Sequence, residues 1–219
     1  MKKAPKKLRV ADRGLTHAYI GDGKGKTTAA VGTAVRAAGY GWKVCFVQFV
    51  KEAAWPSGER QSLRKLGIEV LVLGEGFFKI LNDRKSEEQH KTTALKALEI
   101  LRERVWSGQY QLVVADELGS AVEEGILDKK PVEKFLKDRA KLPPPSRSLP
   151  AGQAGATAPL RPAYRTGRQG GTPPHMVHLI WTGHKKIGWM LKHTDLVTEM
   201  KMLKHPYYKG IIATRGLDY

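Results

Sequence analysis

The segment GDGKGKTT, residues 21–28, constrains the fold of this 219-residue chain more than any other feature of its sequence. An apolar run ending at Ile20 precedes it. The stretch AAVGTAVRAAG follows, and its small, helix-forming residues predict a helix over 26–38. Glycines let backbone N–H groups turn inward and approach anionic oxygens without a Cβ in the way. The positive end of the helix dipole adds to that attraction. The segment therefore predicts a phosphate-binding loop between a strand and a helix.

Two side chains of this loop have expected roles. Lys26 neutralises phosphate charge, and the Thr27 hydroxyl is a ligand for Mg²⁺. The loop is one residue shorter than the general GxxxxGK[ST] pattern, because Ile20 stands where the first glycine would fall, and Lys24 adds a second cation. The alternative is a Gly- and Lys-rich turn that binds nothing, which the strand–loop–helix context disfavours.

An acidic pair follows a later apolar run. QLVVADE, residues 111–117, reads as a buried strand that ends at Asp116 and Glu117. Carboxylates at the end of a strand beside a phosphate-binding loop are suited to hold Mg²⁺, directly or through water. The alternative is a helix N-cap Asp followed by a Glu in the first turn. With the loop upstream, the metal role is favoured.

Short apolar runs alternate with helical patterns along the chain. Continuous apolar runs are typical of strands buried on both faces of a parallel sheet. The expected strands are 16–20, 43–50, 68–73, 111–116, 176–182 and 196–199. The expected helices are 26–38, 58–66, 83–106, 131–140 and 185–192. This alternation predicts an α/β fold with a mostly parallel sheet flanked by helices.

Two basic segments interrupt this organisation. Residues 1–13 hold six cationic residues against Asp12, and residues 141–175 hold five with no acid, so the two account for more than half of the net charge of +17. Pro, Gly and Ala dominate 141–175, and such a composition buries too little apolar surface to offset the entropy of ordering. We expect a basic flexible tail over 1–13 and a single domain over 14–219, interrupted by a low-complexity insertion at 141–175. That insertion is either genuine or the product of an error in the coding sequence.

The remaining composition narrows the class of protein. The lone Cys45 lies in the apolar run KVCFVQFV, which indicates a core residue and leaves no partner for an internal disulfide. No apolar run is long enough to span a membrane, and the basic start lacks the apolar segment of a secretory signal. We therefore expect a cytoplasmic protein with no membrane partner. Tyr164 is the only aromatic residue within the two basic segments, too few for stacking on successive bases, so nucleic-acid binding is not favoured.

Beyond the loop, several motifs stand in the order found in one enzyme family. They are the stretch from GDGKGKTT to FVQFVK, WPSGE at 55–59, GFF at 76–78, VVADEL at 113–118, VHLIWTG at 177–183, DLVTEM at 195–200, LKHPYYKGI at 203–211 and ATRGLDY at 213–219. Over about 16–139 and 176–219 the chain resembles the P-loop type of ATP:corrinoid adenosyltransferase. The resemblance implies a P-loop NTPase fold of the RecA-like kind.

The resemblance also implies a reaction and its partners. The cobalt(I) of a corrinoid, either cobalamin or cobyrinic acid a,c-diamide, attacks the 5′ carbon of ATP, and triphosphate leaves. ATP is then a co-substrate, Mg²⁺ or Mn²⁺ the metal, and a reduced flavoprotein the electron donor. A homodimer is expected. The segment KHPYYKG at 204–210 is implied to lie near the corrinoid or the dimer contact, whereas its residues alone predict a turn with a partly buried tyrosine pair.

Family roles carry over residue by residue. Thr27 and Glu117 match metal ligands, and Arg36 matches an arginine that contacts the nucleotide. Phe77 matches an aromatic residue that crowds the lower face of the corrin, expels the lower ligand and eases reduction of cobalt. Lys26, Glu117 and Phe77 are thus the candidate catalytic residues. The expected triphosphate-binding residues are Gly21, Asp22, Gly23, Lys24, Gly25, Lys26, Thr27 and Thr28.

The chain departs from the family pattern at three places. Lys79 stands where some relatives carry a second aromatic residue, which weakens the expected wedge against the corrin. His184 follows the TG of VHLIWTG where an arginine is common, and a protonated imidazole would replace part of that charge at the nucleotide. The third departure is the insertion at 141–175, which relatives lack.

Two other functions are compatible with parts of the sequence. A generic P-loop ATPase or kinase would use the same loop for phosphoryl transfer and would yield ADP. A nucleic-acid-binding protein would use the basic segments, and its affinity would fall steeply with salt. The ordered set of motifs favours the adenosyltransferase over both.

Overall fold

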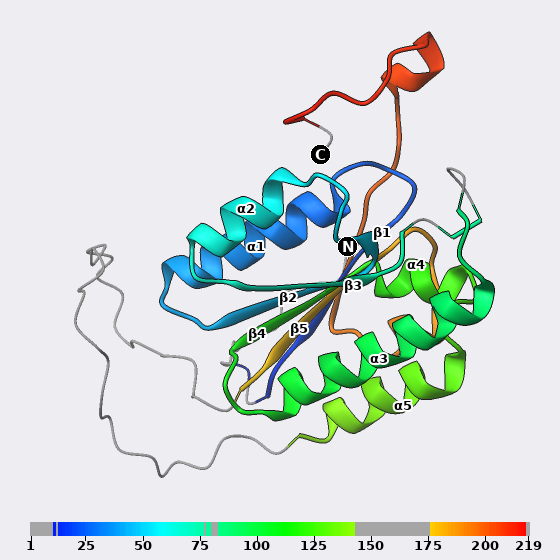
Figure 1. Cartoon of the computed structure of the whole chain (residues 1–219). Helices are drawn as coiled ribbons and strands as arrows, with labels where there is room; N and C mark the ends of the chain where they lie inside the picture. The colour runs from blue at the N-terminus through cyan, green and yellow to red at the C-terminus, as the bar shows by residue number, and fades with distance from the viewer. Residues whose placement is uncertain (1–10, 12, 77, 80–82, 143–175, 218–219) are drawn as a thin grey trace, which may run out of the picture.

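A computed structural model describes residues 11, 13–76, 78–79, 83–142 and 176–217. Its centre is a six-stranded sheet in the order β3-β2-β4-β5-β1-β6, and every pairing between these strands is parallel (Figure 1). The strands are β1 (Thr16–Ile20), β2 (Val44–Glu52), β3 (Glu69–Gly74), β4 (Leu112–Asp116), β5 (His178–Gly183) and β6 (Leu196–Glu199). The predicted α/β class and parallel sheet are confirmed.

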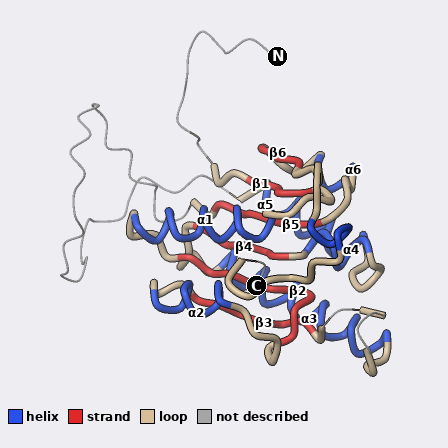
Figure 2. Tube along the Cα trace, turned by 90° about the horizontal axis from the view of Figure 1, so that it is seen from above, coloured by secondary structure: helices blue, strands red, loops and turns tan. Residues whose placement is uncertain are grey.

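Helices cover both faces of the sheet. They are α1 (Lys26–Gly39), α2 (Gly58–Lys65), α3 (Glu87–Trp106), α4 (Leu118–Glu123), α5 (Lys129–Ala140) and α6 (Gly188–Leu191), with a 3₁₀ turn η1 at Pro206–Lys209. In Figures 1 and 2, α1 and α2 lie on one face, whereas α3 and α5 lie on the other. Parallel strands joined by helices give this three-layer arrangement, in which the sheet is hidden from water on both sides.

Two apolar clusters correspond to the two faces. One joins the alanines of α1 and Leu63 of α2 to Phe46 and Ile180 of the sheet. The other joins α3 and α5 to the opposite face, with Trp181 and Phe135 fully buried. Cys45 belongs to this second cluster, where burial raises the pKa of its thiol, which confirms it as a core residue. The apolar side chains thus fix the sheet, and the loops at its edges are left to carry the site.

The element boundaries correct several predictions. Helix α3 begins at Glu87 rather than at Asp83, because Ser86 and Gln89 form a capping box that starts the helix. Asp83 instead accepts hydrogen bonds from the backbone N–H groups of Lys79 and Lys85. The helix expected over 185–192 is shorter and spans only α6. Helix α4 was not predicted, because its six residues follow the acid pair too closely to show a helical period.

The C-terminal segment leaves the body of the protein. After β6, residues 201–217 rise from the edge of the sheet and carry η1 (Figure 1). Tyr207 and Tyr208 are 72% and 74% exposed, so the predicted partial burial of this tyrosine pair is wrong. Within the part of the chain that the structure describes, no helix combines the length and apolarity needed to cross a membrane. Of the tail expected over 1–13 and the insertion expected over 141–175, residues 1–10, 12 and 143–175 lie outside the described residues, as does Phe77.

Candidate functional site

The glycine loop joins β1 to α1 at the carboxyl edge of the sheet. Gly21 and Gly25 have φ angles of +114° and +108°, which favour glycine. The Gly21 N–H donates to the carbonyl oxygen of His184 at 2.9 Å, and the Gly23 N–H donates to that of Met200 at 2.8 Å. A Cβ on Gly21 or Gly23 would lie 2.2 Å or 2.7 Å from backbone atoms of the segment after β6. The loop is therefore pressed against its neighbours and held in one shape.

A cavity of about 540 Å³ opens in front of the second half of this loop. Its walls come from the loop and α1, from the end of β2 and the start of α2, from Glu117 and His184, and from the C-terminal segment. The lining residues are Lys24, Gly25, Lys26, Thr27, Thr28, Val31, Lys51, Gly58, Glu59, Ser62, Glu117, His184, Gly216 and Leu217. Most of the predicted phosphate-binding residues thus share one space.

The first half of the loop faces away from this cavity. Gly21 and Gly23 pack on the backbone of Met200, and the Asp22 carboxylate accepts a hydrogen bond from the Met202 N–H at 3.4 Å. The Lys26 ammonium bends back onto the Gly23 carbonyl oxygen at 2.8 Å. We infer that this half shapes the loop, whereas residues 24–28 present the N–H groups and cations to an anion.

Asp116 sits behind the loop at the end of β4 and is fully buried. Its Oδ1 accepts hydrogen bonds from the hydroxyls of Thr27 and Thr182, each at 2.9 Å. Its Oδ2 accepts one from the Gln48 amide at 3.2 Å. Because the Thr27 hydroxyl donates to Asp116, its lone pairs are left for a cation. Asp116 therefore orients Thr27 and does not itself line the cavity.

Glu117 is the acid that reaches the cavity. It has a φ of 63°, unusual for a residue with a side chain, and its N–H donates to the Thr182 hydroxyl at 2.7 Å. Its Oε2 is buried without a hydrogen-bond partner. Burial, and then the nearby charge of Asp116, raise the pKa of Glu117 to about 7, against the opposing effect of Lys51. An orphaned carboxylate oxygen beside an oriented threonine hydroxyl fits a hard divalent cation such as Mg²⁺.

The cations around the cavity include one that sequence reasoning missed. Lys51, at the end of β2, lines the cavity and pairs with Glu59 at 3.2 Å. Although burial lowers the pKa of Lys51, the charges of Asp116, Glu117 and Glu59 outweigh it and leave the pKa raised. The pKa of Lys26 is lowered by burial, which the surrounding carboxylates only partly oppose. Lys51 stands directly after a buried run, a position that could have drawn attention to it.

Two predicted nucleotide contacts have different outcomes. His184 lines the cavity, but burial, followed by the charge of Lys26, lowers the pKa of its imidazole. This lowering of the pKa opposes the protonated imidazole that the sequence predicts, so the charge of His184 at the nucleotide stays a prediction. Arg36 lies near the far end of α1, about 15 Å along the helix axis from Lys26. There it lines a second cavity, of about 230 Å³, with Trp42 and His178. The structure does not bring Arg36 to the phosphate loop.

The aromatic loop after β3 is described in part. Phe78 packs against the second apolar cluster and meets the His90 ring edge-on, with ring centroids 5.1 Å apart. His90 in turn contacts Asp83 at 3.0 Å. The Lys79 ammonium lies 4.5 Å from the centroid of the Phe78 ring. Lys79, which stands where some relatives carry a second aromatic residue, therefore covers the ring of Phe78. The role of Phe77 stays a prediction.

Comparison with known proteins places this site in a family. A family model described as "ATP:corrinoid adenosyltransferase BtuR/CobO/CobP" matches residues 12–143 and 171–219. A corrinoid adenosyltransferase of Escherichia coli K12 is 30% identical over 95% of this chain and 87% of its own length. A corrinoid adenosyltransferase of Pseudomonas aeruginosa is 32% identical over 95% of this chain and 85% of its own length. The corrinoid adenosyltransferase CobA of Salmonella typhimurium is 31% identical over 95% and 87%. The glycine loop, the acid pair and these matches agree, and the chain belongs to the ATP:corrinoid adenosyltransferase family.

Proposed function

We propose that this protein transfers the 5′-deoxyadenosyl group of ATP to the cobalt(I) of a corrinoid. The observation that carries the proposal is the cavity that gathers Lys24, Lys26, Lys51 and the loop N–H groups beside Glu117. In the reaction a cobalt–carbon bond forms while the bond between C5′ and the α-phosphate oxygen breaks. The bonding electron pair leaves with triphosphate. Negative charge therefore grows on the triphosphate as a whole.

The chain's own residues suit that demand. N–H groups fixed at the start of α1 and the ammonium groups of Lys24, Lys26 and Lys51 would stabilise the departing polyanion. A kinase would instead need an acceptor placed at the terminal phosphate. The 5′ carbon must stay open to the corrinoid, so we place the phosphates in the cavity and the adenosine towards its mouth.

We propose Mg²⁺, or Mn²⁺, as the metal. Thr27 and Glu117 would hold it directly, and Asp116 would act through Thr27, because both Asp116 oxygens already accept hydrogen bonds. Bound there, the metal would neutralise charge on the phosphate oxygens. The support is the buried unpaired Oε2 of Glu117, which a cation would satisfy.

We also propose that the protein is a homodimer, and that a reduced flavoprotein supplies the electron that reduces the corrinoid cobalt to cobalt(I). The support for a dimer is the C-terminal segment, where Leu203 and Ile212 are 90% and 83% exposed, together with the edge strand β6, where Leu196 is 44% exposed. Apolar surface of this kind is typical of association sites. Light scattering of the purified protein, at several concentrations, tests the dimer. Reduced flavodoxin-type proteins, in place of a chemical reductant, test the donor.

One anaerobic assay tests the reaction. Chemically reduced cobalamin and MgATP are incubated with the protein, the absorbance of the corrinoid is followed, and the phosphate products are separated. We expect a light-sensitive alkylcobalt product and one triphosphate for each cobalt alkylated. Formation of ADP without a cobalt–carbon bond would show phosphoryl transfer and overturn the proposal.

A further inference from the structure

Two buried polar residues lie next to the acid pair without touching the cavity. Gln48 is fully buried in the middle of β2, and Arg60 is 4% exposed in the first turn of α2. The Arg60 Nε donates to the Gln48 Oε1 at 2.6 Å, and the Gln48 Nε2 donates to Asp116 at 3.2 Å. A guanidinium is thus connected to the buried carboxylate through one amide.

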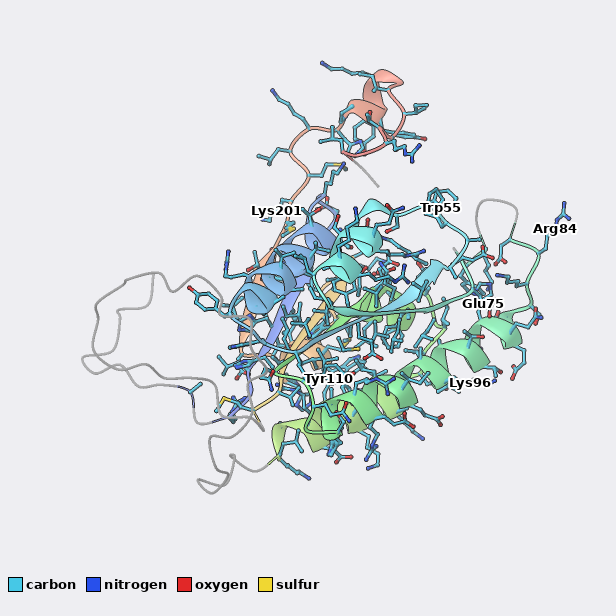
Figure 3. All side chains as sticks on the ribbon, turned by 60° about the vertical axis from the view of Figure 1, so that its left-hand side comes forward. Trp55, Glu75, Arg84, Lys96, Tyr110 and Lys201 are labelled. Atoms are coloured by element: carbon cyan, nitrogen blue, oxygen red, sulfur yellow. The ribbon has the colours of Figure 1, made fainter. Side chains whose placement is uncertain are left out.

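The other side of the Arg60 guanidinium holds a turn. One terminal nitrogen donates to the carbonyl oxygens of Ala53 at 3.2 Å and Trp55 at 2.9 Å. These residues open the connection between β2 and α2, which follows Lys51 and leads to Glu59. In Figure 3, Trp55 lies at the end of the molecule from which Lys201 and the C-terminal segment rise, whereas Tyr110 lies at the opposite end. Arg60 therefore ties this turn to the acid behind the phosphate loop.

A purely structural role explains this arrangement poorly. Burying a guanidinium is costly unless its donors are satisfied, and the second terminal nitrogen of Arg60 is buried without a hydrogen-bond partner. An apolar side chain could fill the same space at lower cost. What the guanidinium adds is a fixed distance between the turn and Asp116, since its planar fork sets the direction of each hydrogen bond.

The consequence concerns the two cavity residues that flank the turn. Lys51 and Glu59 meet each other at 3.2 Å across it, and both line the phosphate cavity. If the turn shifted, the Lys51 ammonium would move relative to Glu117 and the loop. We propose that Arg60 is a positioning residue, which sets Lys51 against the triphosphate by holding the 53–57 turn to Asp116 through Gln48. This rests on the proposed binding of triphosphate in the cavity.

The test uses binding of inorganic tripolyphosphate with Mg²⁺, measured by calorimetry on the full chain, so no corrinoid chemistry is needed. We expect Arg60→Gln to weaken binding by roughly tenfold, a size typical of losing a residue that orients a ligand. Arg60→Lys, which keeps the charge but not the fork, should weaken it nearly as much. Arg64→Gln, one turn later on the exposed face of α2, is the matched control and should stay within about twofold.

A double-mutant cycle separates positioning from folding. If Arg60 acts through Lys51, then Lys51→Met and the pair Lys51→Met with Arg60→Gln should bind tripolyphosphate about equally, because the second change removes nothing further. Additive losses, or a loss confined to melting temperature with unchanged binding by the folded protein, would overturn the proposal. Hydrogen exchange of the amides of residues 53–55 and 57 should rise in Arg60→Gln and not in Arg64→Gln. If the effects of Arg60→Gln and Lys51→Met on tripolyphosphate binding are coupled but no adenosyl transfer occurs, the proposed reaction is refuted and this inference stands.

Discussion

The two ends of helix α1 face two cavities of different character. At its amino end, Lys26 and the loop N–H groups face a space that also contains Glu117, Glu59 and Lys51. At its carboxyl end, Arg36 faces a smaller space walled by Trp42 and His178, whose rings stack 5.3 Å apart. Both spaces contain a cationic side chain from the same helix, so a cation alone does not distinguish a phosphate site.

The difference lies in what surrounds the cation. At the amino end the helix dipole is positive and the carboxyl ends of parallel strands bring acids that suit a metal. At the other end the dipole is negative, and burial, followed by Arg139 and His17, lowers the pKa of His178 to about 4. That imidazole is neutral at pH 7 and adds no charge. The comparison teaches that, of the two ends of α1, the amino end is the one whose described surroundings suit the proposed metal-bound polyanion.

The largest effect is expected from Lys26→Ala. Removing one of the cations that line the proposed triphosphate site should reduce kcat/KM for ATP by roughly 10³-fold, the size found when one donor to a developing anion is lost. The measurement is the initial rate of alkylcobalt formation under anaerobic conditions. A loss of kcat/KM below tenfold would mean that the phosphates bind elsewhere, and that the two ends of α1 do not differ in the way proposed.

Glu117→Gln should come next. The amide keeps the shape but binds a divalent cation weakly, so we expect roughly 100-fold lower activity and a much higher Mg²⁺ requirement. Titration of activity against Mg²⁺ checks this. Asp116→Asn is the matched comparison. Because Asp116 acts through Thr27, its effect on the Mg²⁺ requirement should be smaller, and equal effects would show that both acids contact the metal.

Glu117→Gln should lower activity but raise the stability of the metal-free protein. The folded-state pKa of Glu117, about 7, is above the usual value near 4.5, so the metal-free folded protein keeps a proton that the unfolded chain releases. Its favourable contribution is complete below pH 4.5 and is lost as the pH rises through 7. In EDTA at pH 8, Glu117→Gln should therefore be more stable than the native protein by about 1–3 kcal/mol, with little difference at pH 4.5. Urea unfolding at the two pH values measures this, and equal stability at pH 8 would contradict the raised pKa.

A smaller effect is expected from Gly23→Ala. The added Cβ would lie 2.7 Å from the backbone of Met200 and Lys201, so the loop must move away from the C-terminal segment. We expect a loss of about 1–3 kcal/mol in the free energy of unfolding and about tenfold weaker ATP binding. Gly32→Ala in α1, where an added Cβ meets nothing within 4 Å, is the control. It should leave ATP binding unchanged and, because alanine favours a helix over glycine, raise the free energy of unfolding by about 0.5–1 kcal/mol.

Periodicity and local motifs predicted the sheet and the loop because both depend on neighbours in sequence. The strand over 16–20 and the residues Lys26 and Thr27 follow directly from such patterns. The contacts of Gln48 and Arg60 join residues on different elements, and nothing local announces them except a polar residue inside an apolar run. Lys51 follows a buried run, but its place in the cavity depends on Glu59 and Glu117, which belong to other parts of the chain.

Resemblance alone does not establish the nucleotide contact of Arg36, which stays a prediction. A match at one position carries no information on which end of a 14-residue helix faces the ligand. The capping box at Ser86, by contrast, is a local signal that was visible in SEEQ and overlooked. Patterns thus place elements well, whereas assembling a site needs the distances between them.

The smallest effect is expected from Arg36→Ala, which tests the contrast between the two ends of α1 directly. Arg36→Ala removes the cation at the carboxyl end of α1, and because that end lies about 15 Å along the axis from Lys26, kcat/KM for ATP should fall by no more than about threefold. Steady-state rates at several ATP concentrations measure it, with the Lys26 variant assayed in parallel. A loss approaching that of Lys26→Ala would mean that Arg36 meets the nucleotide after all. Mixing Arg36→Ala with Lys26→Ala protein then separates the two possible sources of this arginine, because activity returns in the hybrid dimer only if Arg36 comes from a second copy.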